Sequence, residues 1–222
     1  MSVAERRHRE KEERRAHILE AAATCFYGIG FEQATMDDVA SAAQLGKGTL
    51  YLYFRNKEEL IVGLVAHRQR ALHQQYADAE RSAPNGVELV RTLLTAYARQ
   101  MSTPAEHLKL ALSRWASGKV LDPEARAAGE LQQGVQLLFG TVVRAIERGQ
   151  QDGTIRSPRA PARLALHLWS CVNGAMLLRL QIQCLPKASD LEVHAPDFDE
   201  AIDMLIESIA HQSEPLAAAG GA

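Results

Sequence analysis

The segment from Thr35 to Leu60, TMDDVASAAQLGKGTLYLYFRNKEEL, places a capped helix, a tight turn and two further helix starts in close succession. Thr35 is a good N-cap residue, and Asp38 three positions later can complete a capping box. The helix that they start carries a narrow apolar stripe of mostly small side chains, Val39, Ala40 and Ala43. Small side chains allow a second helix to cross closely, so we expect a compact helix pair here.

The turn and the helix after it complete the pattern. Residues 44–46 form the turn, in which we expect Gly46 to supply the unusual backbone angles of a sharp corner. Leu50 and Phe54 are spaced to face back onto the first helix. The other sides of this short, acid-free helix carry Lys47, Thr49, Tyr51 and Tyr53. A helix-turn-helix needs this combination to enter a DNA groove.

A third helix begins directly after this pair. Asn56 is expected to cap it, with Glu59 as its partner in a capping box. Lys57 therefore lies at a helix N-terminus, where free N–H groups and the helix dipole already favour an anion.

These residues resemble one family closely. The chain carries Phe31-x-x-Ala-Thr-Met, Val39-Ala40, Ala43 and Gly-Lys-Gly-Thr-Leu-Tyr-x-Tyr-Phe-x-x-Lys-x-x-Leu over residues 46–60. This pattern is similar to the DNA-binding domain of the TetR family of bacterial transcriptional regulators, and it covers about the first quarter of the chain. Two turn positions depart from the family: Gly46 replaces the common serine, and Gln44 replaces the first residue of the usual glycine-valine pair.

The resemblance implies a set of DNA-binding residues: Thr35, Met36, Gly46, Lys47, Gly48, Thr49, Tyr51, Tyr53 and Lys57. Other roles remain open for some of them. Tyr51 and Tyr53 could be half-buried packing residues, and Lys47 could be a solvated surface lysine. Gly48 costs about 1 kcal/mol relative to alanine within a helix, which either close approach to a DNA backbone or a frayed first turn would explain.

Composition excludes several other classes of protein. The net charge is −2, yet residues 1–57 hold nine Lys and Arg against eight Asp and Glu, so positive charge is only local. Three cysteines without CxxC spacing argue against a disulfide framework and a zinc site. The charged N-terminus is unlike a signal peptide, and residues 160–185 are too interrupted by polar groups to span a membrane. We therefore expect a cytoplasmic protein.

Apolar residues recur at three and four positions throughout, which predicts an all-α fold with two domains. We expect a charged extension over 1–15, the helix-turn-helix domain over 16–56, an effector-binding and dimerisation domain over 57–212, and a disordered tail over 213–222. The extension could be a solvated helix or an arm that follows DNA into an adjacent groove. Capping residues before prolines indicate helices at 104–118, 123–151 and 159–184, besides 57–81, 87–101 and 197–211.

The helix at 159–184 is apolar on two faces, which is typical of a helix buried on two sides. In the TetR family the last two helices of each subunit form a four-helix dimer interface, and these two segments resemble that pair. The residues expected there are Leu164, Leu168, Cys171, Ala175, Leu178, Ile202, Leu205, Ile206 and Ile209. An intrachain core is the alternative explanation of the same stripes.

The chain shows no nucleophile elbow, P-loop, dinucleotide-binding fingerprint or metal-binding histidine pair, so we expect no enzyme, no metal and no cofactor. Large or polar side chains on the inner helices suggest a mostly apolar effector pocket, although plain core packing would also explain each one. They are Tyr97, Met101, His107, Trp115, Phe139, Trp169, Asn173 and Met176.

Taken with the resemblance, these features predict a homodimeric repressor that binds a palindromic operator in double-stranded DNA and is released by a small, largely apolar effector. The alternatives are an activator or effector-independent regulator, and a helical ligand-binding or adaptor protein that has lost DNA binding. The motif surface from Lys47 to Lys57 favours a DNA-binding protein.

Overall fold

The computed structural model describes residues 2–102, 126–184 and 197–210. The chain folds into two compact units. The N-terminal unit holds residues 2–74 and 126–137, and the C-terminal unit holds residues 75–102, 138–184 and 197–210. The N-terminal unit therefore extends past position 56, where the sequence placed the end of the DNA-binding domain, into two longer helices. The predicted helix at 104–118 and the predicted tail lie outside the described residues.

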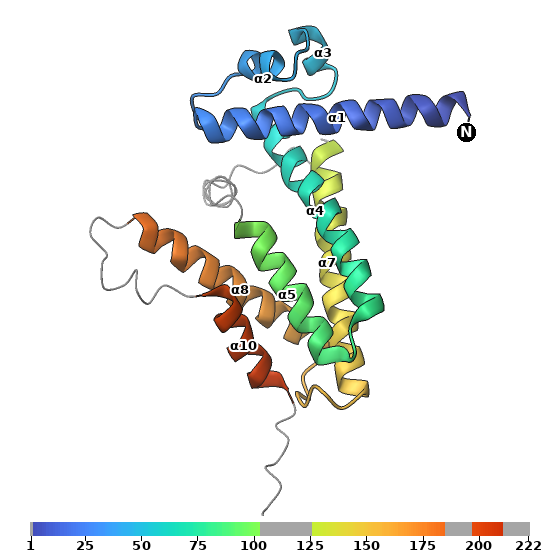
Figure 1. Cartoon of the computed structure of the whole chain (residues 1–222), viewed down its shortest axis with the longest axis vertical. Helices are drawn as coiled ribbons and strands as arrows, with labels where there is room; N and C mark the ends of the chain where they lie inside the picture. The colour runs from blue at the N-terminus through green and yellow to red at the C-terminus, as the bar shows by residue number, and fades with distance from the viewer. Residues whose placement is uncertain (1, 103–125, 185–196, 211–222) are drawn as a thin grey trace, which may run out of the picture. The chain divides into compact units, whose positions relative to one another are not determined.

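The first helix, α1 (Val3–Gly28), includes the charged stretch that the sequence set apart as an extension. Ser2 and Glu5 form a capping box at its start, and the pairs Arg6–Glu10 and Arg9–Glu13 connect successive turns. Such local pairs favour helix over coil in the exposed first turns of this helix. The extension is thus a helix, and its N-terminal end projects beyond α2 and α3 in Figure 1.

Two short helices, α2 (Met36–Ala42) and α3 (Lys47–Tyr51), lie on one side of α1 (Figure 1). Val39 and Leu50 are fully buried, as the sequence predicts, and they pack with Ile18, Leu19 and Ala22 of α1, which are also fully buried. The first part of α4 (Lys57–Ser82) closes this core with Leu60 and Leu64. The prediction of an all-α helix-turn-helix is confirmed.

The C-terminal unit is built on helices that cross at short distance. Its elements are the end of α4, α5 (Gly86–Ser102), the end of α7 (Arg126–Gln151), α8 (Pro161–Cys184) and α10 (Phe198–Ile209). Gly86 lies so near Gly149 that an added Cβ would overlap the backbone of Gly149. The amide of Gly86 also donates to the Asp152 carboxylate at 2.7 Å, which fixes the start of α5.

The start of α8 differs from the prediction. Ser157 and Pro158 were expected to begin this helix, whereas it begins at Pro161. The side-chain amide of Gln150 donates to the carbonyls of Ser157 (2.7 Å) and Arg159 (2.9 Å), and these bonds hold the intervening residues in an extended path. The next proline then takes the first helical position, which suits its fixed φ angle.

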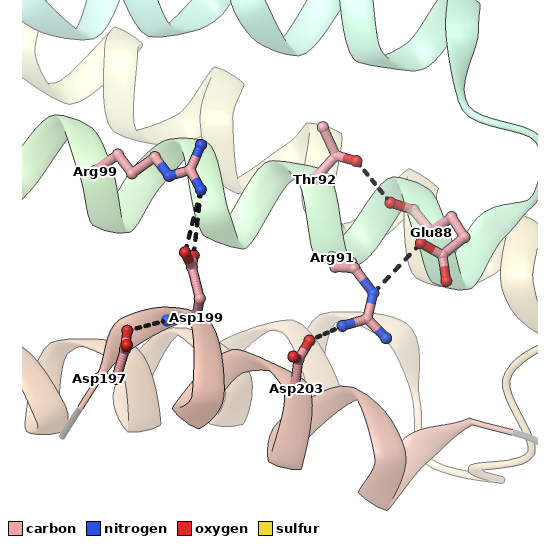
Figure 2. Close-up of polar contacts among 7 residues, drawn as sticks. All are labelled: Glu88, Arg91, Thr92, Arg99, Asp197, Asp199 and Asp203. Carbon is pink, nitrogen blue, oxygen red and sulfur yellow. Dashed lines mark hydrogen bonds and ion pairs between the residues drawn. The ribbon is translucent and has the colours of Figure 1, made fainter.

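The last helix, α10, is fastened to α5 by charged pairs. Arg99 binds Asp199 at 3.1 Å, and Arg91 binds Asp203 while also pairing with Glu88 of its own helix (Figure 2). Below these pairs Ile202, Ile206 and Ile209 are buried. The ion pairs thus fix the register of α10 against α5, and the buried isoleucines hold α10 in the core.

Candidate functional site

The first helix of the motif is capped as the sequence predicts. The Thr35 hydroxyl accepts the Asp38 amide at 3.2 Å, and the Asp38 carboxylate accepts the Thr35 amide at 2.8 Å. Hydrogen bonds from the Thr35 hydroxyl and amide hold the pKa of Asp38 below its usual value. Thr35 is exposed at the surface, but the Met36 side chain is 9% exposed and belongs to the core. The side chain of Met36 is therefore not placed for a DNA contact in this structure.

The turn obtains its corner from Gln44, not from Gly46. Gln44 has φ 54°, in the left-handed region that L residues with a side chain seldom adopt, at a cost of about 1–2 kcal/mol. Gly46 has φ −66° and ψ 143°, which any residue adopts, and it serves as the N-cap of α3 without a side-chain bond. The expectation for Gly46 was wrong, because the chain reverses two residues earlier.

The second helix of the motif, α3, presents polar groups to solvent. Lys47 and Gly48 are exposed, Thr49 is half-buried, and Tyr51 and Leu52 are 44% and 81% exposed. Tyr53 is half-buried and packs against the core. This face offers an ammonium group, a threonine hydroxyl, a phenol and an apolar side chain to a partner.

The two basic residues near this face already have acidic partners. The Lys47 ammonium binds the Asp37 carboxylate of α2 at 2.8 Å, and this hydrogen bond raises the pKa of Lys47. Arg55 pairs with Glu59 at 3.5 Å. Asn56 caps α4 by accepting the Glu59 amide at 2.8 Å, while the Glu59 carboxylate accepts the Arg55 amide rather than that of Asn56. The face is therefore less positive than its sequence suggests.

Lys57 occupies a different place from the one expected. Its ammonium donates to the carbonyls of Phe31 (2.9 Å) and Glu32 (3.2 Å) and lies 4.7 Å from the centroid of the Phe31 ring. An ammonium has three donors, and these bonds hold the turn before α2 against the start of α4. The phosphate contact of Lys57 stays a prediction, and it now has to compete with these carbonyls.

A buried charge lies beside Phe54, which follows α3. Leu50 and Phe54 are fully buried, and the guanidinium of Arg15 lies 4.9 Å from the centroid of the Phe54 ring. Sequence reasoning missed Arg15, which belongs to a mixed-charge run with no apolar period to indicate burial. Two further exposed residues, Asp37 and Leu52, were also missed; the only available signal for Asp37 was an acidic residue about two helical turns before the corner.

Part of the expected effector set comes together in the C-terminal unit. The Tyr97 hydroxyl donates to the Asn173 side chain at 3.0 Å, and the Tyr97 and Phe139 rings lie 6.1 Å and 6.0 Å from that of Trp169. Burial raises the pKa of the Tyr97 phenol, which keeps it a hydrogen-bond donor. Met176 is buried on the same helix as Trp169. We call Tyr97, Phe139, Trp169 and Asn173 the aromatic cluster.

The other residues expected in the effector pocket lie outside the part of the chain that the structure describes. His107 and Trp115 lie outside the described residues, and so does the side chain of Met101. Within the aromatic cluster the Asn173 amide is already used, because it also donates to the Trp169 carbonyl at 2.8 Å. A ligand that bound there would have to exchange with these internal bonds.

The residues expected in a dimer interface separate into two groups. Leu164, Leu168, Ile202, Ile206 and Ile209 are buried within the chain, which matches the alternative explanation as an intrachain core. Ala175 and Leu205 are half-buried, whereas Cys171 and Leu178 are exposed. The exposed side of α8 also carries Leu166 and Leu177, at 52% and 41% exposure. The described structure thus leaves one mostly apolar face of α8 uncovered.

Within the described residues no group of three or more His, Cys, Asp or Glu side chains could hold a metal ion. None of the described helices is long and apolar enough to cross a membrane.

Comparisons with known proteins agree with the motif. Residues 18–64 match the profile described as bacterial regulatory proteins, tetR family. The HTH-type transcriptional regulator TtgR of Pseudomonas putida is 25% identical over 216 residues, which cover 91% of this chain and 96% of TtgR. The HTH-type transcriptional repressor KstR2 of Mycobacterium tuberculosis is 34% identical over 83 residues, 37% of this chain and 42% of KstR2.

Solved structures show the same fold. The transcriptional regulator FadR of Bacillus subtilis, solved in complex with stearoyl-CoA, aligns with a TM-score of 0.63 over 87% of this chain and 98% of FadR. The two sequences are 14% identical, so this likeness concerns the fold alone.

Proposed function

Because this chain belongs to the TetR family of bacterial transcriptional regulators, we propose that it is a repressor that binds a palindromic operator as a homodimer. The observation that carries the proposal is the outer face of α3. Lys47 and Tyr51 are exposed and Thr49 is half-buried, whereas Leu50 of the same helix is fully buried in the core. Hydroxyls and an ammonium on a rigid helix are the groups that contact phosphates and base edges in the major groove.

DNA binding is tested with an operator selected from a random palindromic library and measured by fluorescence anisotropy at several salt concentrations. Lys47→Ala should weaken binding to all sequences and lower the salt slope by about 1, since one phosphate contact is lost. Tyr51→Phe should weaken binding by removing a hydroxyl. Arg144→Ala is the control, because Arg144 is an exposed arginine of the C-terminal unit, paired with Glu80 at 3.1 Å. Failure to select any sequence would favour the alternative of an adaptor that has lost DNA binding.

The uncovered face of α8 supports the homodimer. Exposed residues recur along it every three to four positions, with His167, Ser170, Cys171 and Gly174 between Leu166 and Leu177. Small side chains at the centre of an apolar face suit the close crossing of a second helix, and Met204 of α10 adds an exposed side chain. Two α3 helices of such a dimer must lie ~34–36 Å apart to engage successive half-sites.

Assembly is tested by analytical ultracentrifugation. Leu177→Glu and Leu178→Glu place a charge on the exposed face of α8 and should give folded monomers with reduced operator affinity. Leu137→Glu, at a leucine of α7 that is 61% exposed, should remain dimeric. Variants of Leu168 or Ile206 are unsuitable, because both side chains are buried and their loss would unfold the chain. A dimer that persists in both glutamate variants of α8 would place the interface elsewhere.

The proposed release by a small, largely apolar molecule rests on the aromatic cluster. Three aromatic rings lie together there with one amide, and small-molecule sites commonly combine apolar groups with a few polar anchors. KstR2 carries the name of repressor, and FadR was solved with stearoyl-CoA. A ligand that prefers a conformation with wrongly spaced α3 helices lowers the DNA-bound population by its differential affinity.

Release is tested by screening apolar compounds for loss of anisotropy from the labelled operator. Compounds that act through the aromatic cluster should lose potency against Trp169→Phe and Asn173→Ala proteins that still bind DNA. A compound that releases both variants as well as it releases the original protein would place the effector site elsewhere. An effector-independent regulator would bind DNA equally well with every compound.

A further inference from the structure

Arg15 of α1 is a charged side chain buried behind the DNA-facing helix. The residue is 3% exposed, and its Nη1 lies 3.1 Å from Oε2 of Glu130 on α7. The central carbon of the guanidinium lies 4.9 Å from the centroid of the Phe54 ring. A buried cation is unfavourable without an anionic partner, so its position depends on Glu130.

The space around Arg15 connects it to the end of α3. The amide of Phe54 donates to the Leu50 carbonyl at 3.1 Å, which ties the ring to the last turn of this helix. Gly63 of α4 leaves the necessary room: an added Cβ would lie 2.9 Å from the Phe54 ring and 3.4 Å from Nη2 of Arg15. A guanidinium packed this closely cannot move without disturbing the Phe54 ring.

Glu130 is itself held by a network of charges within the N-terminal unit. Arg126 donates to Glu130 at 2.7 Å and to Glu12 of α1 at 2.8 Å, and Arg70 of α4 lies 3.9 Å from Glu12. The network therefore joins α1, α4 and α7. Helix α7 continues without a break to Gln151 and carries Phe139 of the aromatic cluster in its second half.

We propose that Arg15 is a positioning residue for the DNA-facing helix and that Glu130 of α7 sets its position. While Glu130 stays against Arg15, the guanidinium supports Phe54 and α3 keeps its orientation. When α7 withdraws Glu130, the unpaired cation turns toward water and the support of α3 is lost. The effect of withdrawing Glu130 rests on the proposed DNA-binding function. Through this effect a movement of α7 would change the affinity for the operator.

The experiment compares Glu130→Gln, Arg15→Met and the double variant in operator binding. Glu130→Gln keeps the size of the side chain and removes its charge. Each single change should weaken binding at least tenfold, and the double variant should bind no more weakly than Arg15→Met, since both changes remove one interaction. The matched controls are Arg144→Met and Glu80→Gln, an exposed pair in the C-terminal unit that should leave affinity unchanged.

Amide hydrogen exchange separates positioning from loss of stability. In Glu130→Gln the amides of Leu50, Tyr53 and Phe54 should exchange faster, whereas those of Val39 in α2 and of its C-cap Ala43 should keep their rates. Equal acceleration throughout the N-terminal unit, or no acceleration at α3, would overturn the proposal, as would additive losses of affinity. Arg15→Gln, which also removes the charge but keeps a polar side chain, replaces Arg15→Met if the latter fails to fold.

The two proposals fail in different ways. If the unmodified protein binds no DNA, the proposed function is wrong, and the exchange rates of α3 still decide whether Arg15 positions this helix. If the unmodified protein binds its operator and the Glu130→Gln variant binds equally well, the proposal for Arg15 is wrong and the proposed function stands.

Discussion

The N-terminal unit around α2 and α3 and the C-terminal unit around α5 and α10 hold their helices in different ways. The short helices α2 and α3 depend on a capping box, a strained turn residue and small core side chains such as Ala40 and Ala43. The longer helices of the C-terminal unit depend on direct approach of backbones at Gly86 and Gly149, and on the ion pairs between α5 and α10.

The difference determines how each unit responds to a change. A cap or a turn residue contributes about 1 kcal/mol and can be altered while the core stays intact. A backbone crossing has no space for even one methyl group, so a single change there affects the whole unit. The surface of α3 can therefore vary without loss of the fold, whereas the crossing of α5 and α7 cannot.

The largest effect is expected at that crossing. Gly86→Ala should lower the free energy of unfolding by about 3 kcal/mol, because its Cβ would overlap the backbone of Gly149. Gly129→Ala is the control: a Cβ on this glycine of α7 would meet nothing within 4 Å, so the change should be neutral or stabilising. Urea unfolding measures the free energy of unfolding of both variants. Equal stability of the two would show that the approach of Gly86 to Gly149 does tolerate a methyl group.

A smaller effect of opposite sign is expected at the turn. Gln44→Gly should raise the free energy of unfolding by about 1 kcal/mol, since glycine adopts the left-handed region without strain. Gln44→Ala keeps a Cβ at the same angle and should bring no gain. Thermal unfolding in the presence of operator and without it measures the change, and a loss of stability in the glycine variant would show that the Gln44 side chain itself is needed.

An effect of about the same size is expected at Gly48, where a substitution should raise stability and lower operator affinity. Gly48→Ala should stabilise α3 by up to about 1 kcal/mol, because its Cβ would meet nothing within 4 Å in the free protein. If DNA approaches this glycine closely, the same methyl group should weaken operator binding. Anisotropy titration measures the operator affinity of this variant and thermal unfolding measures its stability. Unchanged or improved affinity would show that DNA does not approach Gly48 closely.

The smallest effect is expected at the ion pair on the surface of the motif. Asp37→Asn should strengthen binding to random DNA by a few-fold, in keeping with the roughly 0.2–1 kcal/mol typical of exposed pairs. Removing the carboxylate leaves the Lys47 charge uncompensated and should steepen the salt dependence. Glu58→Gln, at the start of α4, is a control for the change in net charge. Equal affinities of the Asp37→Asn variant and the original protein would show that the pair opens at no cost.

The sequence predicted the motif well because its signals are local. Capping residues such as Thr35 and Asn56 act within one turn of helix, and the spacing of Leu50 and Phe54 follows from helix geometry alone. The left-handed angle at Gln44 was missed because composition pointed to the glycine two positions later. Local signals thus located the helices of the motif, whereas the residue type alone misplaced the corner by two positions.

Features that depend on distant partners could not be predicted in the same way. Nothing in the charged run around Arg15 indicates that Phe54 and Glu130 will enclose this residue. The bonds from Gln150 that delay the start of α8 likewise join residues in different elements. On α8 itself the sequence showed two apolar stripes, and only packing against the rest of the unit distinguishes the buried Leu168 from the exposed Leu178.

The pairing of Lys47 with Asp37 and of Arg55 with Glu59 has a consequence for the search along a chromosome. Affinity for arbitrary sequences comes almost entirely from cations placed against phosphates, and here the motif brings its cations with their own carboxylates. If the protein binds DNA as proposed, we therefore expect it to leave wrong sites quickly, so that a larger share of its copies is free in solution. Occupancy of the operator then depends on contacts that only the correct sequence completes, so that few molecules per cell suffice to distinguish it.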